Sequence, residues 1–159
     1  LIACKNDMAH QSIAAQLAKH SITRKYVAIV KGNLKEDEGT VDAPVARSKN
    51  DRKKMDVSGE GKRAVTHYKV LERLNNYTYI ECTLETGRTH QIRVHMSHIH
   101  HPLLGDSVYG SEKESMKLKG QCLHARTFGF IHPSTDEYME FEAPVPEYFC
   151  EILEKLRKK

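Results

Sequence analysis

Residues 84–95 read LETGRTHQIRVH, and they mark the point where the chain changes from strand-like to helix-like patterning. The residues just before this stretch alternate apolar and polar side chains, as a half-buried strand does. Gly87 allows a sharp turn or a close approach of the backbone to another group. Ile92, Met96 and Ile99 then recur at helical spacing. The stretch therefore predicts a strand, a glycine hinge and a short helix in succession.

The hinge and the start of the helix carry a dense set of polar side chains. The residues concerned are Arg88, Thr89, His90 and Gln91. Hydrogen-bond donors beside a helix N-terminus favour an anion such as phosphate. Arg93 lies further on among apolar residues, where an arginine needs a carboxylate partner. The alternative is a capped helix with a solvated basic face, but polar donors packed between two apolar segments favour a function.

Strands and a helix are predicted upstream of this stretch. Residues 64–71 and 77–84 alternate apolar and polar positions around an Asn-Asn pair, which predicts a hairpin. Residues 25–30 (KYVAIV) are an apolar run and predict a strand buried on both faces. Residues 7–20 predict a helix with Asp7 as its N-cap.

The remaining segments complete an α+β pattern. Residues 40–45 predict a weak strand, and residues 52–63 predict an exposed polar loop. Residues 123–131 and 137–143 predict two more strands, and a closing helix follows Pro146. The inner face of that helix consists of Phe149, Ile152, Leu153 and Leu156. Because hairpins outnumber β-α-β units, the predicted class is α+β, a largely antiparallel mixed β-sheet with flanking helices.

Charge and composition fit a partner that carries phosphates. The formal net charge is +4, and basic residues concentrate in residues 47–54 and 155–159. Such runs fit nucleic acid, although a solvated surface is the commoner explanation. No stretch has the length of a membrane span, and no signal peptide pattern is visible. The 4 cysteines lack CxxC spacing, which indicates reduced thiols and a cytoplasmic protein.

The histidines between residues 90 and 101 raise the alternative of a zinc site. His95 and His98 are close in sequence, but no nearby cysteine or clear glutamate completes a standard ligand set. The sequence therefore favours histidines at the surface or facing RNA, and no metal. Tyr26 interrupts the apolar run of residues 25–30, and on this strand alone it fits a core tyrosine.

Six segments follow the order and spacing of a known enzyme family and cover nearly the whole chain. They are LIACKND (1–7), RKYVAIVKG (24–32), GKRAVTHYKVL (61–71), LETGRTHQIRVHM (84–96), HPLLGDSVYG (101–110) and LHARTFGFIHP (123–133). Together they resemble the Rlu-type pseudouridine synthases, which modify bacterial ribosomal RNA. The resemblance implies cleavage of the bond between uracil N1 and the ribose and rejoining through C5, without cofactor or metal. It also implies that the uridine is flipped out of its stack.

The resemblance implies roles for individual residues. Tyr26 matches the tyrosine that lies against the target base and is the candidate for removing its C5 proton. Arg93 matches the arginine that pairs with a nucleophilic aspartate and keeps it ionised. The residues expected to contact RNA or substrate are Lys25, Arg88, Thr89, His90, Gln91 and His95.

The nucleophilic aspartate is expected outside this chain. In the family it lies in an HRLDxxTSG or HRIDxxTSG motif just before the segment that matches LIACKND, and the chain begins at Leu1 within the end of that motif. We therefore expect residues 1–159 to be a partial catalytic domain that is inactive alone. Its expected partner is ribosomal RNA, with transfer RNA as the second candidate. The alternatives are a non-catalytic RNA-binding module and a metal hydrolase built on the histidines.

Overall fold

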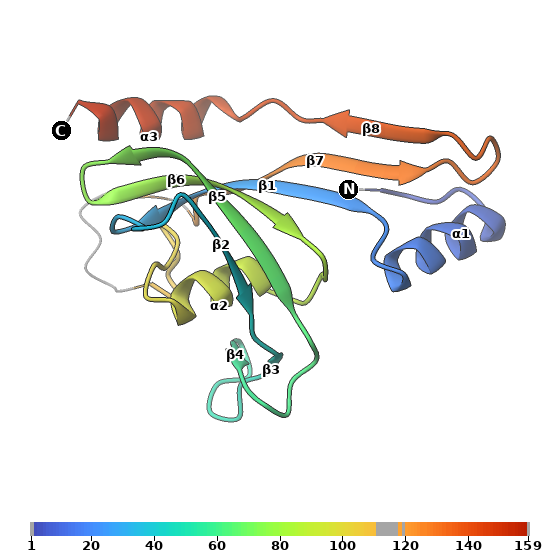
Figure 1. Ribbon diagram of the computed structural model, residues 1–159, viewed down its shortest axis with the longest axis horizontal. Helices are drawn as coiled ribbons and strands as arrows, with labels where there is room; N and C mark the ends of the chain where they lie inside the picture. The colour runs from blue at the N-terminus through green and yellow to red at the C-terminus, as the bar shows by residue number, and fades with distance from the viewer. Residues whose placement is uncertain (1, 111–117, 119, 159) are drawn as a thin grey trace.

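The structure, a computed structural model, describes residues 2–110, 118 and 120–158. The strands are β1 (Thr23–Lys31), β2 (Glu38–Asp42), β3 (Val45–Arg47), β4 (Met55–Val57), β5 (Val65–Leu74), β6 (Tyr77–Leu84), β7 (Leu123–Ile131) and β8 (Tyr138–Glu142). The helices are α1 (Asp7–Ala18), α2 (Gln91–His98) and α3 (Glu147–Arg157). Six strands form one sheet in the order β2-β5-β6-β1-β7-β8, with every neighbouring pair antiparallel (Figure 1). Strands β3 and β4 form a separate pair.

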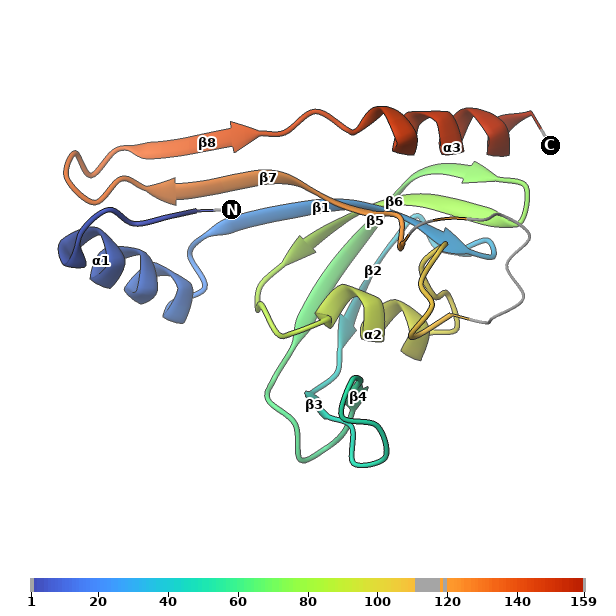
Figure 2. The same ribbon diagram turned by 180° about the vertical axis from the view of Figure 1, so that it is seen from behind.

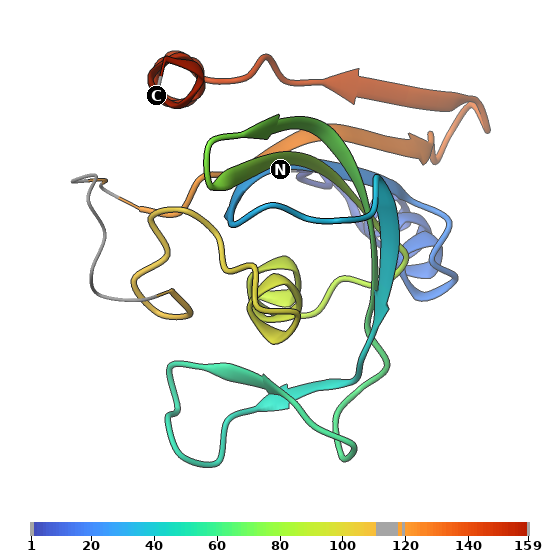
Figure 3. The ribbon, with the colours of Figure 1, turned by 60° about the vertical axis from the view of Figure 1, so that its left-hand side comes forward.

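Strand β1 lies in the middle of the large sheet, and its side chains alternate between two apolar cores. Val27 and Ile29 pack on the side of α3, together with Phe149. Ala28 and Val30 pack on the side of α2. The two helices therefore cover opposite faces of the sheet, as Figure 3 shows from the side. The inner face predicted for α3 is confirmed, because those residues are buried in the first core.

Helix α1 lies beside the end of β7 (Figure 2). The side chain of Asn6 accepts a hydrogen bond from the Ala9 N–H at 2.9 Å, so the prediction of Asp7 as the N-cap is wrong by one residue. The Gln16 amide bonds to both the N–H and the carbonyl oxygen of Ile131, each at 2.8 Å. These bonds hold α1 against the β7–β8 end of the sheet.

The α+β class and the largely antiparallel sheet are confirmed. The hairpin of β5 and β6 and the extent of β7 follow the sequence prediction. The exposed loop predicted for residues 52–63 is wrong in part, because it contains β4. The strand predicted at residues 40–45 is divided between β2 and β3. None of the helices in the described part of the chain has the length and apolar character needed to cross a membrane.

Candidate active site

Residues 85–90 connect β6 to α2 and carry most of the predicted site. Gly87 lies close to a side chain of β1, because a Cβ at Gly87 would overlap the guanidinium of Arg24. His90 has a φ of 56° and precedes the first residue of α2 in a left-handed conformation. The predicted order of strand, glycine hinge and helix is therefore confirmed.

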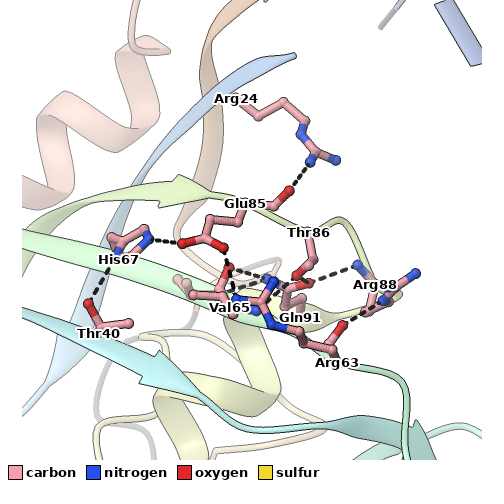
Figure 4. A network of polar contacts seen from close by, with 10 residues as sticks. Arg24, Thr40, Arg63, Val65, His67, Glu85, Thr86, Arg88 and Gln91 are labelled. Atoms are coloured by element: carbon pink, nitrogen blue, oxygen red, sulfur yellow. Dashed lines mark hydrogen bonds and ion pairs between the residues drawn. The ribbon is translucent and has the colours of Figure 1, made fainter. Parts of the chain in front are cut away.

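Two buried side chains fasten this loop to β5 (Figure 4). The Thr86 hydroxyl accepts a hydrogen bond from the Val65 N–H at 2.9 Å and donates to Gln91 Oε1 at 2.7 Å. Gln91 Nε2 donates to the Val65 carbonyl oxygen at 2.9 Å and to the Thr66 hydroxyl at 3.0 Å. Gln91 Oε1 also accepts from the Arg88 N–H at 2.9 Å. Gln91 is only 2% exposed, so the predicted contact of its side chain with RNA does not fit, and it supports the loop instead.

His95 has a similar internal role. Its Nδ1 is 2.9 Å from the Thr66 hydroxyl, and its Nε2 is 2.9 Å from the Ala43 carbonyl oxygen. A carbonyl only accepts, so Nε2 carries the proton and Nδ1 accepts from Thr66. Burial lowers the pKa of His95, and the bond to Ala43 only partly offsets that effect. A neutral imidazole thus connects α2 to β5, and the predicted RNA contact of His95 does not fit.

Arg93 has the carboxylate partner that its position requires. Its Nε and Nη2 donate to the two carboxylate oxygens of Asp106 at 2.7 and 2.8 Å. Asp106 also accepts from the Val108 and Tyr109 N–H groups, both at 3.0 Å. Burial raises the pKa of Asp106, but the bonds from Arg93 and the backbone outweigh it, so the pKa is lowered overall. The pair is therefore ionised, buried and fixed in orientation.

Tyr109 connects this ion pair to the loop and to β4. The Arg93 guanidinium lies 4.9 Å from the centre of its ring. The Tyr109 hydroxyl accepts a hydrogen bond from the Met55 N–H at 2.8 Å and lies 3.0 Å from His90 Nδ1. Burial lowers the pKa of His90. Because Nδ1 is engaged with Tyr109, only Nε2 of His90 is left for the predicted contact with RNA.

Arg88 and Thr89 line an open groove beside this network. The groove has a volume of about 410 Å³ and lies between the loop and the β3–β4 pair. Arg47 and Lys62 contribute further positive charge to its walls, and Glu60 contributes one carboxylate. The Arg88 Nε donates to the Arg63 carbonyl oxygen at 3.0 Å, which holds the side chain at the edge of the loop (Figure 4). Arg88 and Thr89 thus lie in the wall of an open groove, and their contact with RNA stays a prediction.

Tyr26 and Lys25 are neighbours on β1 and therefore point to opposite faces of the sheet. Tyr26 is half-buried and packs against the core on the α2 side, the side that also carries Arg93. Its hydroxyl forms no hydrogen bond within the described part of the chain. Lys25 points to the α3 side and lies 3.6 Å from Glu81 in an ion pair. Lys25 therefore lies on the face opposite to Tyr26, and its contact with RNA stays a prediction.

The predicted histidine cluster disperses in the structure. His98 and His100 are exposed at the end of α2, while His101 bonds to the Lys31 carbonyl oxygen at 2.8 Å. Across residues 2–110, 118 and 120–158, no group of three or more His, Cys, Asp or Glu side chains is arranged to hold a metal ion. The histidines are therefore divided between internal hydrogen bonds and solvent.

Comparison with known proteins identifies the fold. Residues 1–98 match the family described as RNA pseudouridylate synthase, and this segment contains β1, the loop and α2. The chain belongs to the RNA pseudouridylate synthase family. This membership agrees with the resemblance that the six sequence segments indicated. It does not favour the non-catalytic RNA-binding module or the metal hydrolase.

Relatives of this pseudouridylate synthase chain come from several bacteria. An uncharacterized RNA pseudouridine synthase of Bacillus subtilis is 55% identical over 158 residues, which cover 99% of this chain and 52% of that protein. The ribosomal large subunit pseudouridine synthase D of Zymomonas mobilis is 51% identical over 156 residues, covering 92% of this chain and 49% of that protein. The name of the Zymomonas mobilis relative supports the Rlu-type assignment. The chain spans about half the length of these curated relatives.

Two solved structures share the fold. The human RNA pseudouridylate synthase domain containing 4 superposes with a TM-score of 0.77 at 26% identity, covering 96% of this chain and 69% of that one. The human RNA pseudouridylate synthase domain containing 1 gives a TM-score of 0.76 at 24% identity, covering 98% and 74%. The sheet with α2 and α3 on opposite faces is thus the fold of the family.

Proposed function

We propose that the protein isomerises uridine to pseudouridine in ribosomal RNA, as an Rlu-type synthase. The observation that carries this proposal is that Tyr26 and Arg93 lie on the same side of the sheet, the side covered by α2. Family membership supplies the reaction type, and the names of the bacterial relatives favour ribosomal RNA. Transfer RNA stays the second candidate substrate.

The proposed reaction conserves all atoms. The bond between uracil N1 and the ribose C1′ breaks, the base turns, and a bond forms between C5 and C1′. The C5 proton leaves and N1 gains a proton, so no oxidant, reductant or cofactor is required. Tyr26, half-buried on the α2 side, is our candidate for the group that accepts the C5 proton. Burial against the apolar core would hold its ring in a fixed orientation toward the base.

Arg93 is our candidate for positioning the nucleophilic carboxylate. Two of its nitrogens hold Asp106, which fixes the plane of the guanidinium. The third nitrogen, Nη1, forms no hydrogen bond with the described residues. A nucleophilic aspartate that approached Nη1 would be kept ionised by the adjacent positive charge.

We further propose that this aspartate lies outside residues 1–159. Asp106 is poorly suited to attack a ribose, because its side chain has no exposed surface and both oxygens accept hydrogen bonds. Asp7 begins α1 and Asp42 ends β2, so neither belongs to the Arg93 network. A chain restricted to these residues should therefore bind RNA without turning it over.

Tritium release tests the proposal. RNA labelled with tritium at uridine C5 loses its label when the C5 to C1′ bond forms. The full-length natural protein should release tritium from ribosomal RNA transcripts, and residues 1–159 alone should not. Release by residues 1–159 alone would contradict the external aspartate. No release by the full-length protein from either ribosomal or transfer RNA would contradict the function itself.

A cytoplasmic location completes the proposal. No disulfide joins any of the 4 cysteines, as is usual in a reducing compartment. Ribosomal RNA is modified in that compartment in bacteria, so the location follows from the proposed substrate. Fractionation of cells that carry a tagged protein would check it.

A further inference from the structure

Arg24 is a half-buried cation for which the proposed reaction provides no role. It lies two residues before Tyr26 on β1, so both side chains point to the α2 side. Its Nη2 donates to the Glu85 carbonyl oxygen at 3.0 Å (Figure 4). Its Nη1 packs against Gly87 so closely that a Cβ there would overlap it. Arg24 thus connects the strand of Tyr26 to the loop that carries Arg88.

The charge of Arg24 is not neutralised within the described part of the chain. Its Nε is buried and has no hydrogen-bond partner among the described residues. The carboxylate of Glu85 is 3.2 Å from Arg63 and 2.8 Å from His67 instead. Burial lowers the pKa of Arg24, the nearby Tyr26 partly offsets this effect, and the nearby charge of Arg88 lowers the pKa further. The guanidinium groups of Arg24 and Arg88 therefore repel each other, and an anion bound by both would relieve this repulsion.

We propose that Arg24 and Arg88, which flank Gly87, jointly bind one phosphate of the RNA strand next to the target uridine. The inference rests on the proposed function, because RNA supplies the anion. A guanidinium matches a phosphate with two parallel N–H groups, and a modest rotation of Arg24 would direct its unpaired Nε toward such a ligand. The phosphate would hold the strand between the groove beside Arg88 and the face of Tyr26. Gly87 then matters because its missing side chain leaves room for the Arg24 guanidinium.

RNA binding at several salt concentrations tests this inference. The probe is a fluorescein-labelled oligouridylate, and the protein is the full-length natural enzyme. Arg24→Gln should raise Kd about tenfold, the usual effect of losing a charge-assisted hydrogen bond. It should also reduce the slope of log K against log salt by about 0.7, as expected for one phosphate contact on a single strand. Arg88→Gln should behave alike.

Arg157→Gln is the matched control. Arg157 lies on α3, on the opposite face, and is paired with Glu72 at 2.6 Å. Its loss should leave Kd and the salt slope unchanged. If Arg157→Gln and Arg24→Gln changed Kd and the salt slope equally, the effect would reflect only the net charge of the protein. That result would overturn the proposal.

Gly87→Ala displaces the Arg24 guanidinium while leaving its charge in the protein. It should weaken binding like Arg24→Gln, and the double variant should bind no worse than either single one, because both remove the same contact.

Arg24→Lys, which keeps the charge without Nε, covers the case in which Arg24→Gln does not fold. Its affinity should be between that of wild type and that of Gly87→Ala. Wild-type Kd and slope in Arg24→Gln, or in Arg24→Lys and Gly87→Ala together, would overturn the proposal. Tritium release is measured separately, so a protein that binds through Arg24 but releases no tritium contradicts only the proposed function.

Discussion

The two faces of the large sheet are each covered by one helix, but their interiors differ in kind. On the α3 side, Val27, Ile29 and Phe149 belong to a core of apolar residues. On the α2 side, an apolar core is accompanied by a set of buried polar residues. They are Thr66, Thr86, Gln91, Arg93, His95 and Asp106. The same sheet therefore carries one face held by apolar packing and one face held partly by hydrogen bonds.

From this difference we infer that the proposed active site is on the α2 side of the sheet. Buried polar groups are destabilising unless each finds a partner, whereas apolar packing has no such requirement. The partners on the α2 side fix the loop, Arg93 and α2 in a single arrangement. Apolar residues of similar volume would often be as stable as a buried ion pair. We therefore interpret the polar network as the framework of the active site and the α3 side as structural support.

The largest contrast between the two faces should be kinetic. Tyr26→Phe in the full-length protein should lower turnover by about 10²–10⁴-fold, the usual contribution of a general base, as measured by tritium release. Stability should be unchanged, because the hydroxyl has no hydrogen bond within the described residues. Tyr79→Phe is the control, since Tyr79 lies on the α3 side with its ring 5.9 Å from that of Phe149. Near-normal turnover in Tyr26→Phe would remove the tyrosine from the mechanism.

The next largest effect should be on folding stability at the buried ion pair. Asp106→Ala should lower the free energy of unfolding by about 3–5 kcal/mol, because it leaves the Arg93 charge buried and unpaired. The comparison is Glu72→Ala, which breaks the exposed pair with Arg157 and should cost about 0–1 kcal/mol. Urea unfolding of both variants measures the difference. Equal small losses would mean that water reaches the Arg93 pair.

These predictions rest on contacts that the sequence indicated unequally. The extent of β7 and the inner face of α3 were predictable because strand and helix periodicity repeat over many residues. The burial of Gln91 and His95 was not predictable, because polar residues on a short helix resemble a solvated surface. Their partners on β5 and beyond β2 are distant in sequence. The sequence did not identify Asp106 as the partner of Arg93, because the two residues are 13 positions apart and only the fold brings them together.

The opposite orientation of Lys25 and Tyr26 could be predicted from the sequence alone. The two residues are adjacent in a predicted strand, and adjacent strand residues face opposite sides. The position of the Gly87 hinge could also be predicted from the sequence. Its close contact with Arg24 could not, because that contact depends on how the loop lies against β1 in the fold.

A smaller contrast should appear when side-chain shape is kept. Thr86→Val should cost about 1–3 kcal/mol, because the buried Val65 N–H and Gln91 Oε1 lose a partner. Ile152→Leu on the α3 side should cost less than about 1.5 kcal/mol, since hydrophobic volume is preserved. Hydrogen exchange separates the two faces further. Amides in residues 85–91 should exchange faster in Thr86→Val and at the wild-type rate in Ile152→Leu; unchanged exchange in Thr86→Val would show that the loop is held by other contacts.

The smallest effect should be a pH dependence that originates on the α2 side. Burial lowers the pKa of His95 in the folded protein, whereas the unfolded chain has the ordinary value of about 6.5. Above that value both states are neutral, so the contribution of His95 to stability is complete. As the pH falls below about 6.5, the unfolded chain binds the proton first, and the free energy of unfolding decreases until the lowered folded pKa is reached.

His95→Gln isolates this effect. Glutamine can donate to the Ala43 carbonyl oxygen but does not titrate. Because the variant loses the buried imidazole ring that joins Ala43 and Thr66, it should be less stable than wild type near neutral pH. The stability difference should then shrink as the pH is lowered, because only the wild type loses stability through this residue. His90, whose pKa burial also lowers, is present in both proteins, so its contribution cancels in the difference. Guanidinium unfolding over a pH series measures both curves. Parallel curves would show that the folded protein accommodates a protonated His95, and that the hydrogen bonds to Ala43 and Thr66 are not those of a neutral imidazole.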